Sequence, residues 1–201
     1  MKKKITIFFA IVIILLGLFG LTGCNLLENN DNKEENKVEV QEENSLDGLA
    51  VYQEEEDANY KLCEDMEGIT FKCPSNYTSV GKSSSQPIYM DPDVPGASVN
   101  VVSENMPSML SFEGYIEASK ASVKNQSQMT ILGDITTEYI NLNGVKAAKL
   151  IYQAKQSNME LDITQIVLEK EGKVYVFSLG GLTKDREVLA PKFDKIIKSI
   201  K

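Results

Sequence analysis

Histidine and tryptophan are absent from this chain of 201 residues, and cysteine occurs only three times. Without histidine, the Ser-His-Asp and Cys-His nucleophile systems, histidine metal sites and histidine proton relays are all excluded. Lysine and arginine (21) are outnumbered by aspartate and glutamate (29), giving a net charge of −8. The chain therefore lacks the basic footprint of a nucleic-acid-binding protein. We predict no nucleic-acid partner, no cofactor and no enzymatic activity.

What is present is an ordinary globular composition, 42% hydrophobic and 25% charged. It excludes a fully disordered, collagen-like or multi-span membrane chain. The negative charge is concentrated near the N-terminus. Residues 25–57 contain twelve acids and two lysines, a net of −10, whereas residues 58–201 contain 17 acids and 16 bases, a net of −1. The part of the chain expected to fold is therefore nearly neutral.

The N-terminus has the parts of a bacterial lipoprotein signal peptide in the expected order. Residues 2–4 are lysines, and the uncharged run over residues 5–19 is long enough for a signal peptide but short for a transmembrane span. Leu21-Thr22-Gly23-Cys24 follows and matches the lipobox, in which a small residue precedes the cysteine that receives diacylglycerol. We predict that residues 1–23 are removed and that the lipidated Cys24 anchors the protein to the extracytoplasmic face of the cell membrane.

Residues 24–57 are predicted to form this lipidated cysteine and an acidic, disordered tether. The stretch from residue 28 to residue 37 has no apolar side chain, so it cannot bury enough surface to offset the entropy of ordering. A small apolar island follows within the same segment, which would either form a short helix or dock on the domain. Its members are Leu46, Leu49, Val51 and Tyr52.

Residues 58–201 are enough for one hydrophobic core and are predicted to form a single α+β domain. Asn143-Gly144 is a strong hairpin signal, and Ser111 can cap a helix with apolar residues at helical spacing. The predicted strands are residues 69–73, 98–103, 130–142, 145–154, 161–169 and 174–179, and the predicted helices are residues 111–126 and a C-terminal helix kinked or broken at Pro191. The mixed strand faces favour a central antiparallel sheet flanked by helices on both faces.

The order of these segments resembles the PsbP-like family. The resemblance covers roughly residues 64–201 and is carried by Cys-Pro-Ser-Asn-Tyr (73–77), Leu-Ser-Phe-Glu-Gly-Tyr-Ile (110–116), Val-Lys-Ala-Ala-Lys-Leu-Ile-Tyr (145–152) and Pro-Lys-Phe-Asp-Lys-Ile-Ile-Lys-Ser-Ile (191–200). It implies an α/β/α sandwich around an antiparallel sheet. The family includes bacterial lipoproteins, photosystem extrinsic subunits and a Ran-GTPase-binding protein. It brings no invariant catalytic residues, so the resemblance favours an accessory or binding role.

Cys63 and Cys73 remain after Cys24 is assigned to the lipid anchor, an even pair in an exported protein. A disulfide between them is favoured, and two unpaired thiols are the main alternative. A redox or metal role is disfavoured, because the spacing is not C-x-x-C and zinc would need two further ligands without histidine.

Four other motifs have a simpler structural interpretation. Ser79 and Lys82 match S-x-x-K, but the accompanying S-D-N and K-T-G elements are missing. Asp91 and Asp93 are weak candidates for calcium, which needs six or more oxygens, so we predict no metal site.

Gly180-Gly181 before Thr183, Lys184 and Arg186 suggests an anion site, but a turn and a helix cap are favoured. Met106-Pro-Ser-Met-Leu110 is an apolar loop that either contacts a partner or packs under the neighbouring helix.

The favoured function is a lipid-anchored, non-enzymatic accessory, interaction or ligand-binding module of the cell envelope, with an unidentified envelope protein as its partner. The alternatives are a carboxylate-based envelope enzyme and a small-molecule or metal carrier. A deep pocket with two convergent acids of raised pKa would favour the enzyme.

Overall fold

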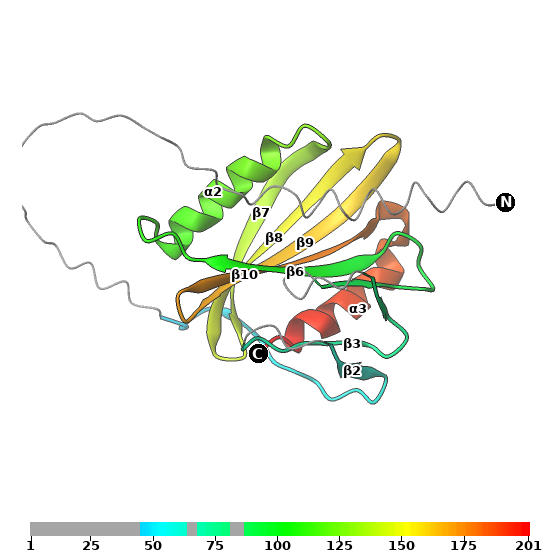
Figure 1. Ribbon diagram of the computed structural model, residues 1–201, viewed down its shortest axis with the longest axis horizontal. Helices are drawn as coiled ribbons and strands as arrows, with labels where there is room; N and C mark the ends of the chain where they lie inside the picture. Colours follow the sequence, from blue (N-terminus) through cyan, green and yellow to red (C-terminus); the bar gives the residue numbers. More distant parts are fainter. Residues whose placement is uncertain (1–44, 64–67, 81–86) are drawn as a thin grey trace, which may run out of the picture.

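A computed structural model describes residues 45–63, 68–80 and 87–201 of the chain. Most of the described domain is one eight-stranded sheet with the strand order β1-β7-β8-β9-β10-β6-β5-β4 (Figure 1). Its strands are β1 (Ala50–Tyr52), β4 (Thr78–Ser79), β5 (Ile88–Met90), β6 (Ser98–Asn105), β7 (Thr130–Leu142), β8 (Val145–Gln156), β9 (Met159–Lys170) and β10 (Lys173–Leu182). A separate two-stranded sheet pairs β2 (Tyr60–Leu62) with β3 (Lys72–Pro74).

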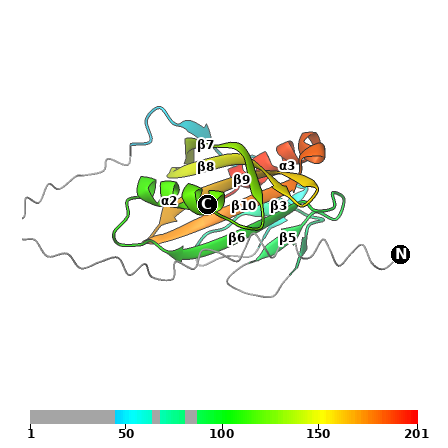
Figure 2. The ribbon, with the colours of Figure 1, turned by 90° about the horizontal axis from the view of Figure 1, so that it is seen from above.

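The large sheet is mixed, which corrects the prediction of an antiparallel sheet. β1 runs parallel to β7, with Ala50 opposite Ile140 and Tyr52 opposite Leu142, whereas the other neighbouring strands of the described sheet pair antiparallel. Two helices accompany it, α2 (Phe112–Lys124) and α3 (Arg186–Lys198). Figures 1 and 2 show the helices well apart, each over a different part of the sheet. They leave much of the sheet without a helical cover.

The buried apolar residues form two clusters, and consecutive residues of β10 alternate between them. Val174 and Val176 pack with α2 in what we call the α2-side cluster, whereas Tyr175 and Phe177 pack with α3 in the α3-side cluster. Because successive side chains of a strand point to opposite faces of a sheet, the two clusters lie on opposite sides of β10. This explains why β10 lacks the alternation of a half-exposed strand: both of its faces are buried.

Helix α2 begins where its sequence predicts. The Ser111 hydroxyl accepts a hydrogen bond from the backbone N–H of Gly114 at 3.1 Å, which satisfies one of the unpaired donors of the first turn. The apolar stripe buries its members against the sheet; they are Phe112, Tyr115, Ile116 and Val123.

Helix α3 has no break at Pro191, one of the two alternatives predicted there, and the glycine pair before it also differs from the prediction. The helix runs without a break from Arg186 to Lys198, with Pro191 inside it. Gly180 and Gly181 do not end the last strand, because β10 continues through them to Leu182. A short 3-10 turn (Thr183–Asp185) then leads into α3.

The N-terminal part of the domain was predicted too short. Residues 50–57 fall within the predicted tether, whose apolar island was expected to form a short helix or to dock on the domain. Val51 and Tyr52 of this island dock as part of β1 in the large sheet, and the acidic residues after it bind lysines that are distant in sequence. Glu54 pairs with Lys72 (2.5 Å) and Lys201, Glu55 with Lys198 (2.8 Å), and Asp57 with Lys195 (2.5 Å). The acidic run is therefore partly neutralised by the folded domain, and the domain begins before residue 58.

Asn143, at the tip of the β7–β8 hairpin, joins this N-terminal segment to the C-terminus. It has a left-handed backbone (φ 50°), a conformation that asparagine tolerates better than most residues. Its backbone N–H donates to the Tyr52 carbonyl (3.0 Å), and its Nδ2 donates to the carbonyls of Lys198 (2.8 Å) and Ile200 (2.7 Å). Its Oδ1 accepts the N–H of Glu54 at 3.2 Å.

Replacing Gly181 with alanine is expected to destabilise the domain by about 1–3 kcal/mol. A Cβ atom at Gly181 would overlap Cδ1 of Leu189, a core residue of α3 that is 3% exposed. Gly180→Ala is the matched control, because its new Cβ would find its nearest neighbours at 3.9 Å. Urea unfolding measures both variants. Equal unfolding midpoints for the two would show that Gly181 is not required for the close approach of α3.

Candidate functional site

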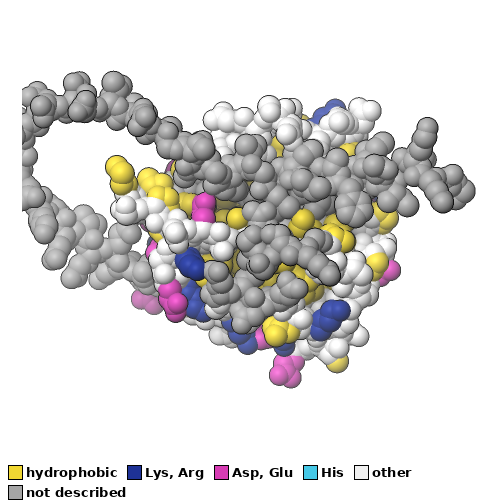
Figure 3. All heavy atoms as spheres, viewed as in Figure 1, with side chains coloured by type: hydrophobic (Ala, Val, Ile, Leu, Met, Phe, Trp, Pro, Cys, Tyr) yellow, Lys and Arg dark blue, Asp and Glu magenta, His cyan; other side chains and the backbone are white. Residues whose placement is uncertain are grey.

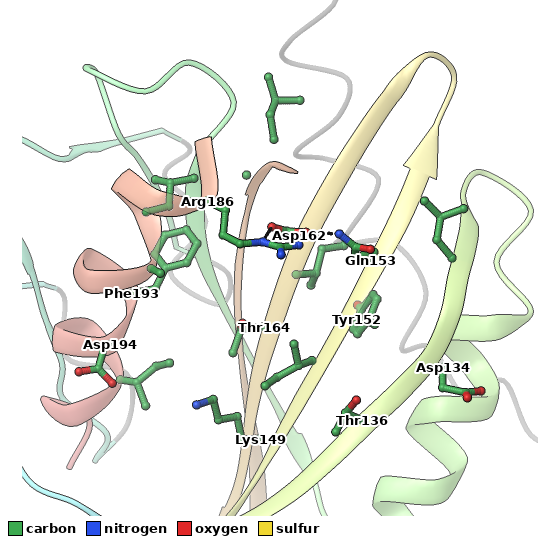
Figure 4. Close-up of a pocket in the computed structure, with 18 residues that line it drawn as sticks. Asp134, Thr136, Lys149, Tyr152, Gln153, Asp162, Thr164, Arg186, Phe193 and Asp194 are labelled. Carbon is green, nitrogen blue, oxygen red and sulfur yellow. Dashed lines mark hydrogen bonds and ion pairs between the residues drawn. The ribbon is translucent and has the colours of Figure 1, made fainter. Parts of the chain in front are cut away.

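The candidate site of the described domain is a groove between α3 and β7, with β8 and β9 as its floor (Figure 4). We call it the α3 groove; its volume is about 630 Å³. It exists because α3 packs against β10 and β3 and stops short of β7 and β8. On the far side, β7 contains an irregularity between Leu132 and Thr136, where Gly133 takes a φ of 79°.

The floor of the groove comes from one face of two neighbouring strands. Lys149, Ile151 and Gln153 alternate along β8, and Ile151 and Gln153 lie opposite Thr164 and Asp162 of β9. Ile151 is 40% exposed, which is unusual for an isoleucine in a central strand. The wall of α3 adds apolar side chains: Leu189, Ala190, Phe193 and Ile197. The groove is therefore apolar along its middle.

An ion-pair network closes one end of the groove. The Arg186 guanidinium binds the Asp162 carboxylate through Nε to Oδ2 (2.5 Å) and Nη2 to Oδ1 (2.8 Å). Oδ1 also accepts hydrogen bonds from Gln153 Nε2 (2.8 Å) and the Thr183 hydroxyl (3.2 Å). The Arg186 guanidinium, opposed by partial burial and helped by Gln153, holds the pKa of Asp162 below its ordinary value. Asp162 is thus a fixed, neutralised anion.

Lys149 lies at the other end, beside the N-terminal strand. Its Nζ donates to the Tyr52 hydroxyl (2.8 Å) and lies 4.9 Å from the centre of the Tyr52 ring. Glu138 Oε2 is 3.9 Å from the same Nζ. The cation is thus held by an aromatic ring and a distant carboxylate, and its side chain is 17% exposed.

This arrangement suits binding better than acid–base or nucleophilic chemistry. The groove combines an apolar middle with polar groups at its two ends, the usual composition of a ligand site. Most of its charged groups have partners: Asp162 with Arg186, Lys149 with Glu138, and Asp194 with Lys198 at 3.0 Å. Asp134 of β7 also lines the groove. The carboxylate with a shifted pKa in this groove, Asp162, is shifted downward, the opposite of what a general acid requires.

The predicted weak metal candidates, Asp91 and Asp93, lie outside the groove and are engaged elsewhere. Asp91 is buried; its Oδ2 accepts from Lys192 Nζ (2.6 Å), and its Oδ1 accepts from the N–H groups of Asp93 (2.9 Å) and Val94 (3.3 Å). Asp93 accepts from Asn76 Nδ2 (2.6 Å). Asp91 therefore holds a loop to α3. In the described ranges no three residues of metal-ligating type come together as a site.

The other predicted positions are scattered. Cys63 and Cys73 are joined by a disulfide within the α3-side cluster. Cys24 and Lys82 lie outside the described residues. The Thr183 hydroxyl and the Arg186 guanidinium, suggested as an anion site, contact the chain's own Asp162. A weak sequence signal for the groove existed in β8, where Lys149, Ile151 and Gln153 alternate with fully apolar positions.

The comparisons with known proteins agree with this architecture. The family described as PsbP-like protein matches residues 5–201, and the chain therefore belongs to the PsbP-like family. The solution structure of cyanobacterial PsbP (CyanoP) from Synechocystis sp. PCC 6803 has a TM-score of 0.56 at 16% identity, over 73% of this chain and 94% of that one. The two proteins share a fold.

Two more distant structures show a weaker likeness. LpqN of Mycobacterium tuberculosis, described as involved in cell envelope biogenesis, has a TM-score of 0.47 at 16% identity, over 71% of this chain and 90% of LpqN. The Ran-binding protein Mog1p of Saccharomyces cerevisiae has a TM-score of 0.46 at 12% identity, over 71% of this chain and 95% of Mog1p. No curated protein matches the sequence.

Within residues 45–63, 68–80 and 87–201, no helix has the length and apolar character to span a membrane.

Proposed function

We propose that the protein is a lipid-anchored lipoprotein on the extracytoplasmic face of the cell membrane, where it serves as a non-enzymatic accessory or ligand-binding module. The observation that carries the proposal is the ordered N-terminal sequence: three lysines, the uncharged run over residues 5–19, and Leu21-Thr22-Gly23-Cys24. The pairing of Cys63 with Cys73 supports export, because structural disulfides persist mainly outside the cytoplasm.

Lipidation of Cys24 would hold the protein at the membrane permanently. Each buried methylene contributes about 0.8 kcal/mol, and one acyl chain alone gives only marginal binding. A diacylglycerol carries two chains, which satisfies the two-signal requirement for stable anchoring. The domain would then act close to the membrane surface.

The binding role is supported by the α3 groove. Its exposed Ile151 and the apolar wall of α3 offer a surface for a partner or ligand, and the carboxylate of Asp162 at one end is neutralised by Arg186. The lowered pKa of Asp162 argues against the carboxylate-based enzyme. The volume of about 630 Å³ lies in the range of small-molecule sites, which keeps a small-molecule carrier as the second candidate.

Crosslinking in intact cells tests the proposal. The wild-type chain is expected to co-purify from the membrane fraction with a stoichiometric partner, and Cys24→Ala is expected to leave the membrane and lose that partner. Ile151→Glu should lose the partner while staying in the membrane, because it places a charge on the apolar floor. Val188→Glu is the matched control, since Val188 is 53% exposed and outside the groove.

Two results would contradict the proposal. Membrane attachment of the Cys24→Ala chain would refute the lipid anchor. Capture of no partner by either the wild-type or the Val188→Glu chain would refute the interaction module, and the groove would then be screened with small molecules by thermal shift, comparing wild type with Ile151→Glu.

A further inference from the structure

A short apolar loop protrudes at one end of the domain. Met109, between β6 and α2, is 94% exposed, the highest value among the exposed large hydrophobic residues of the described chain, and its neighbour Leu110 is 37% exposed. Figure 3 shows hydrophobic side chains projecting from the left-hand edge of the molecule, the end at which α2 begins in Figure 1. We call the segment from Met106 to Leu110 the apolar loop. The sequence left open whether this loop contacts a partner or packs under the neighbouring helix.

The apolar loop is held in place at its base. The backbone N–H of Met106 donates to the Gly172 carbonyl of the β9–β10 turn (2.8 Å), and its side chain packs against the α2-side cluster. The N–H of Leu110 donates to the Pro107 carbonyl (3.0 Å), and Ser111 then caps α2. The structure thus presents Met109 outward on a fixed base, instead of folding it under the helix.

The chain enters the domain at this same end. Leu46 lines a small recess together with Phe112, the first residue of α2 and two positions after Leu110. In both Figure 1 and Figure 2, the start of the described chain and the loop before α2 lie at the left-hand end of the molecule. The 22 residues from Cys24 to Ser45 can reach at most about 75 Å, and a flexible chain of that length averages about 25 Å.

The charged residues around this end include both acids and lysines, without an excess of positive charge. The β9–β10 turn carries Glu169 and Glu171 against Lys170 and Lys173. Glu113 at the start of α2 is paired with Lys146 at 2.7 Å. Asp47 and the acidic segment before it add negative charge at the same end. Charge would therefore not attract this end to an anionic lipid surface, and apolar contact would have to bind it.

We propose that the apolar loop inserts Met109 and Leu110 into the interface of the membrane that carries the protein, and so fixes the orientation of the domain on the lipid surface. The inference rests on the proposed lipid anchor at Cys24, which keeps this end near the bilayer. The Lys149 end of the α3 groove, near the β7–β8 hairpin, then faces the membrane more closely than the Arg186 end.

Depth-dependent quenching tests the inference on the lipidated, full mature chain. A fluorophore on Ser108→Cys leaves Met109 and Leu110 intact, and Val188→Cys provides an exposed control position on α3. The protein is reconstituted into phosphatidylcholine–phosphatidylglycerol vesicles that contain nitroxide-labelled lipid. Quenching at residue 108 is expected to be several-fold stronger than at residue 188. Adding Met109→Glu to the Ser108→Cys chain is expected to reduce the quenching at 108 to the level at 188.

Vesicle flotation separates the failure of this inference from the failure of the anchor. Equal quenching at both positions in protein that floats with the vesicles would overturn the membrane contact and leave the lipid anchor standing. Strong quenching at 108 that survives Met109→Glu would also overturn the role of the loop. Protein that does not float would refute the anchor, and the inference with it.

Discussion

Replacing Asp91 with alanine is expected to lower the free energy of unfolding by about 2–4 kcal/mol. The Asp91 side chain is fully buried and accepts a hydrogen bond from Lys192 Nζ at 2.6 Å. Its other oxygen accepts two backbone N–H groups of the loop between β5 and β6. Alanine would leave the lysine and both N–H groups without their acceptor. The unfolding midpoint in urea measures the loss.

Asp91→Asn is the matched control, since it keeps the shape of the side chain and removes the charge. Burial opposes ionisation of Asp91, but Lys192 and the N–H of Asp93 outweigh it, so the pKa of Asp91 lies below its ordinary value. A lowered pKa in the folded state stabilises the fold above the unfolded pKa of about 3.9, and this contribution is lost as the pH falls through the folded value. The free energy of unfolding of the wild type should therefore exceed that of Asp91→Asn at neutral pH, and the two values should converge in acid. A constant difference over this range would contradict the assignment.

Removing the Cys63–Cys73 disulfide is expected to destabilise the domain by roughly 2.5–3 kcal/mol in the chain-entropy model. The two cysteines are ten positions apart, and both are buried in the α3-side cluster. The double variant Cys63→Ala, Cys73→Ala tests the magnitude by urea unfolding. The mass of the purified wild type should also be two hydrogens below that of the reduced chain.

A reductant provides the internal control for this second prediction. It should lower the unfolding midpoint of the wild type toward that of the double variant, and it should leave the double variant unchanged. If the untreated wild type has the mass of free thiols, the disulfide is absent and the interpretation of two unpaired cysteines is correct.

The long hairpins of the fold could be predicted from sequence because their signals are local. The Asn143-Gly144 turn has φ values of 50° and 89°, and the Glu171-Gly172 turn has values of 54° and 73°. Such backbones favour asparagine and glycine, so the sequence itself marks the turns. The flanking strands are also long enough for their runs of apolar residues to be recognised in the sequence.

The short strands could not be predicted, because their partners are distant. β1 has three residues inside an acidic segment, and it pairs with residues 140–142. The charges after it are neutralised by Lys72, Lys195 and Lys198, none of them a sequence neighbour. Local composition therefore left the apolar island around Val51 and Tyr52 as either a short helix or a docked segment, and tertiary contacts decide for a docked strand.

The α3 groove was missed for a related reason. The local sequence gives no sign of a site around Lys149, Asp162 or Arg186. These residues line one cavity only because α3 covers part of the sheet. Strand alternation could place Lys149, Ile151 and Gln153 on one face. It could not show that this face lacks a helix above it. Gly181 was a partial sequence signal for this arrangement, because a residue without a side chain permits α3 to approach β10 closely.

The parallel strand β1 also has a mechanical consequence. A pull on the proposed membrane anchor would reach the domain first at this strand, which three residue pairs join to β7, and next at Asn143 and the acidic side chains after it. Detachment of β1 and of the ion pairs after it would transfer residues 45–57, thirteen in all, to the link, a stretch that spans at most about 45 Å at 3.3–3.6 Å per residue. The rest of the sheet and both helices would stay intact. The first strand would thus act as an extensible coupling that lets the domain move away from the bilayer under load without unfolding its core.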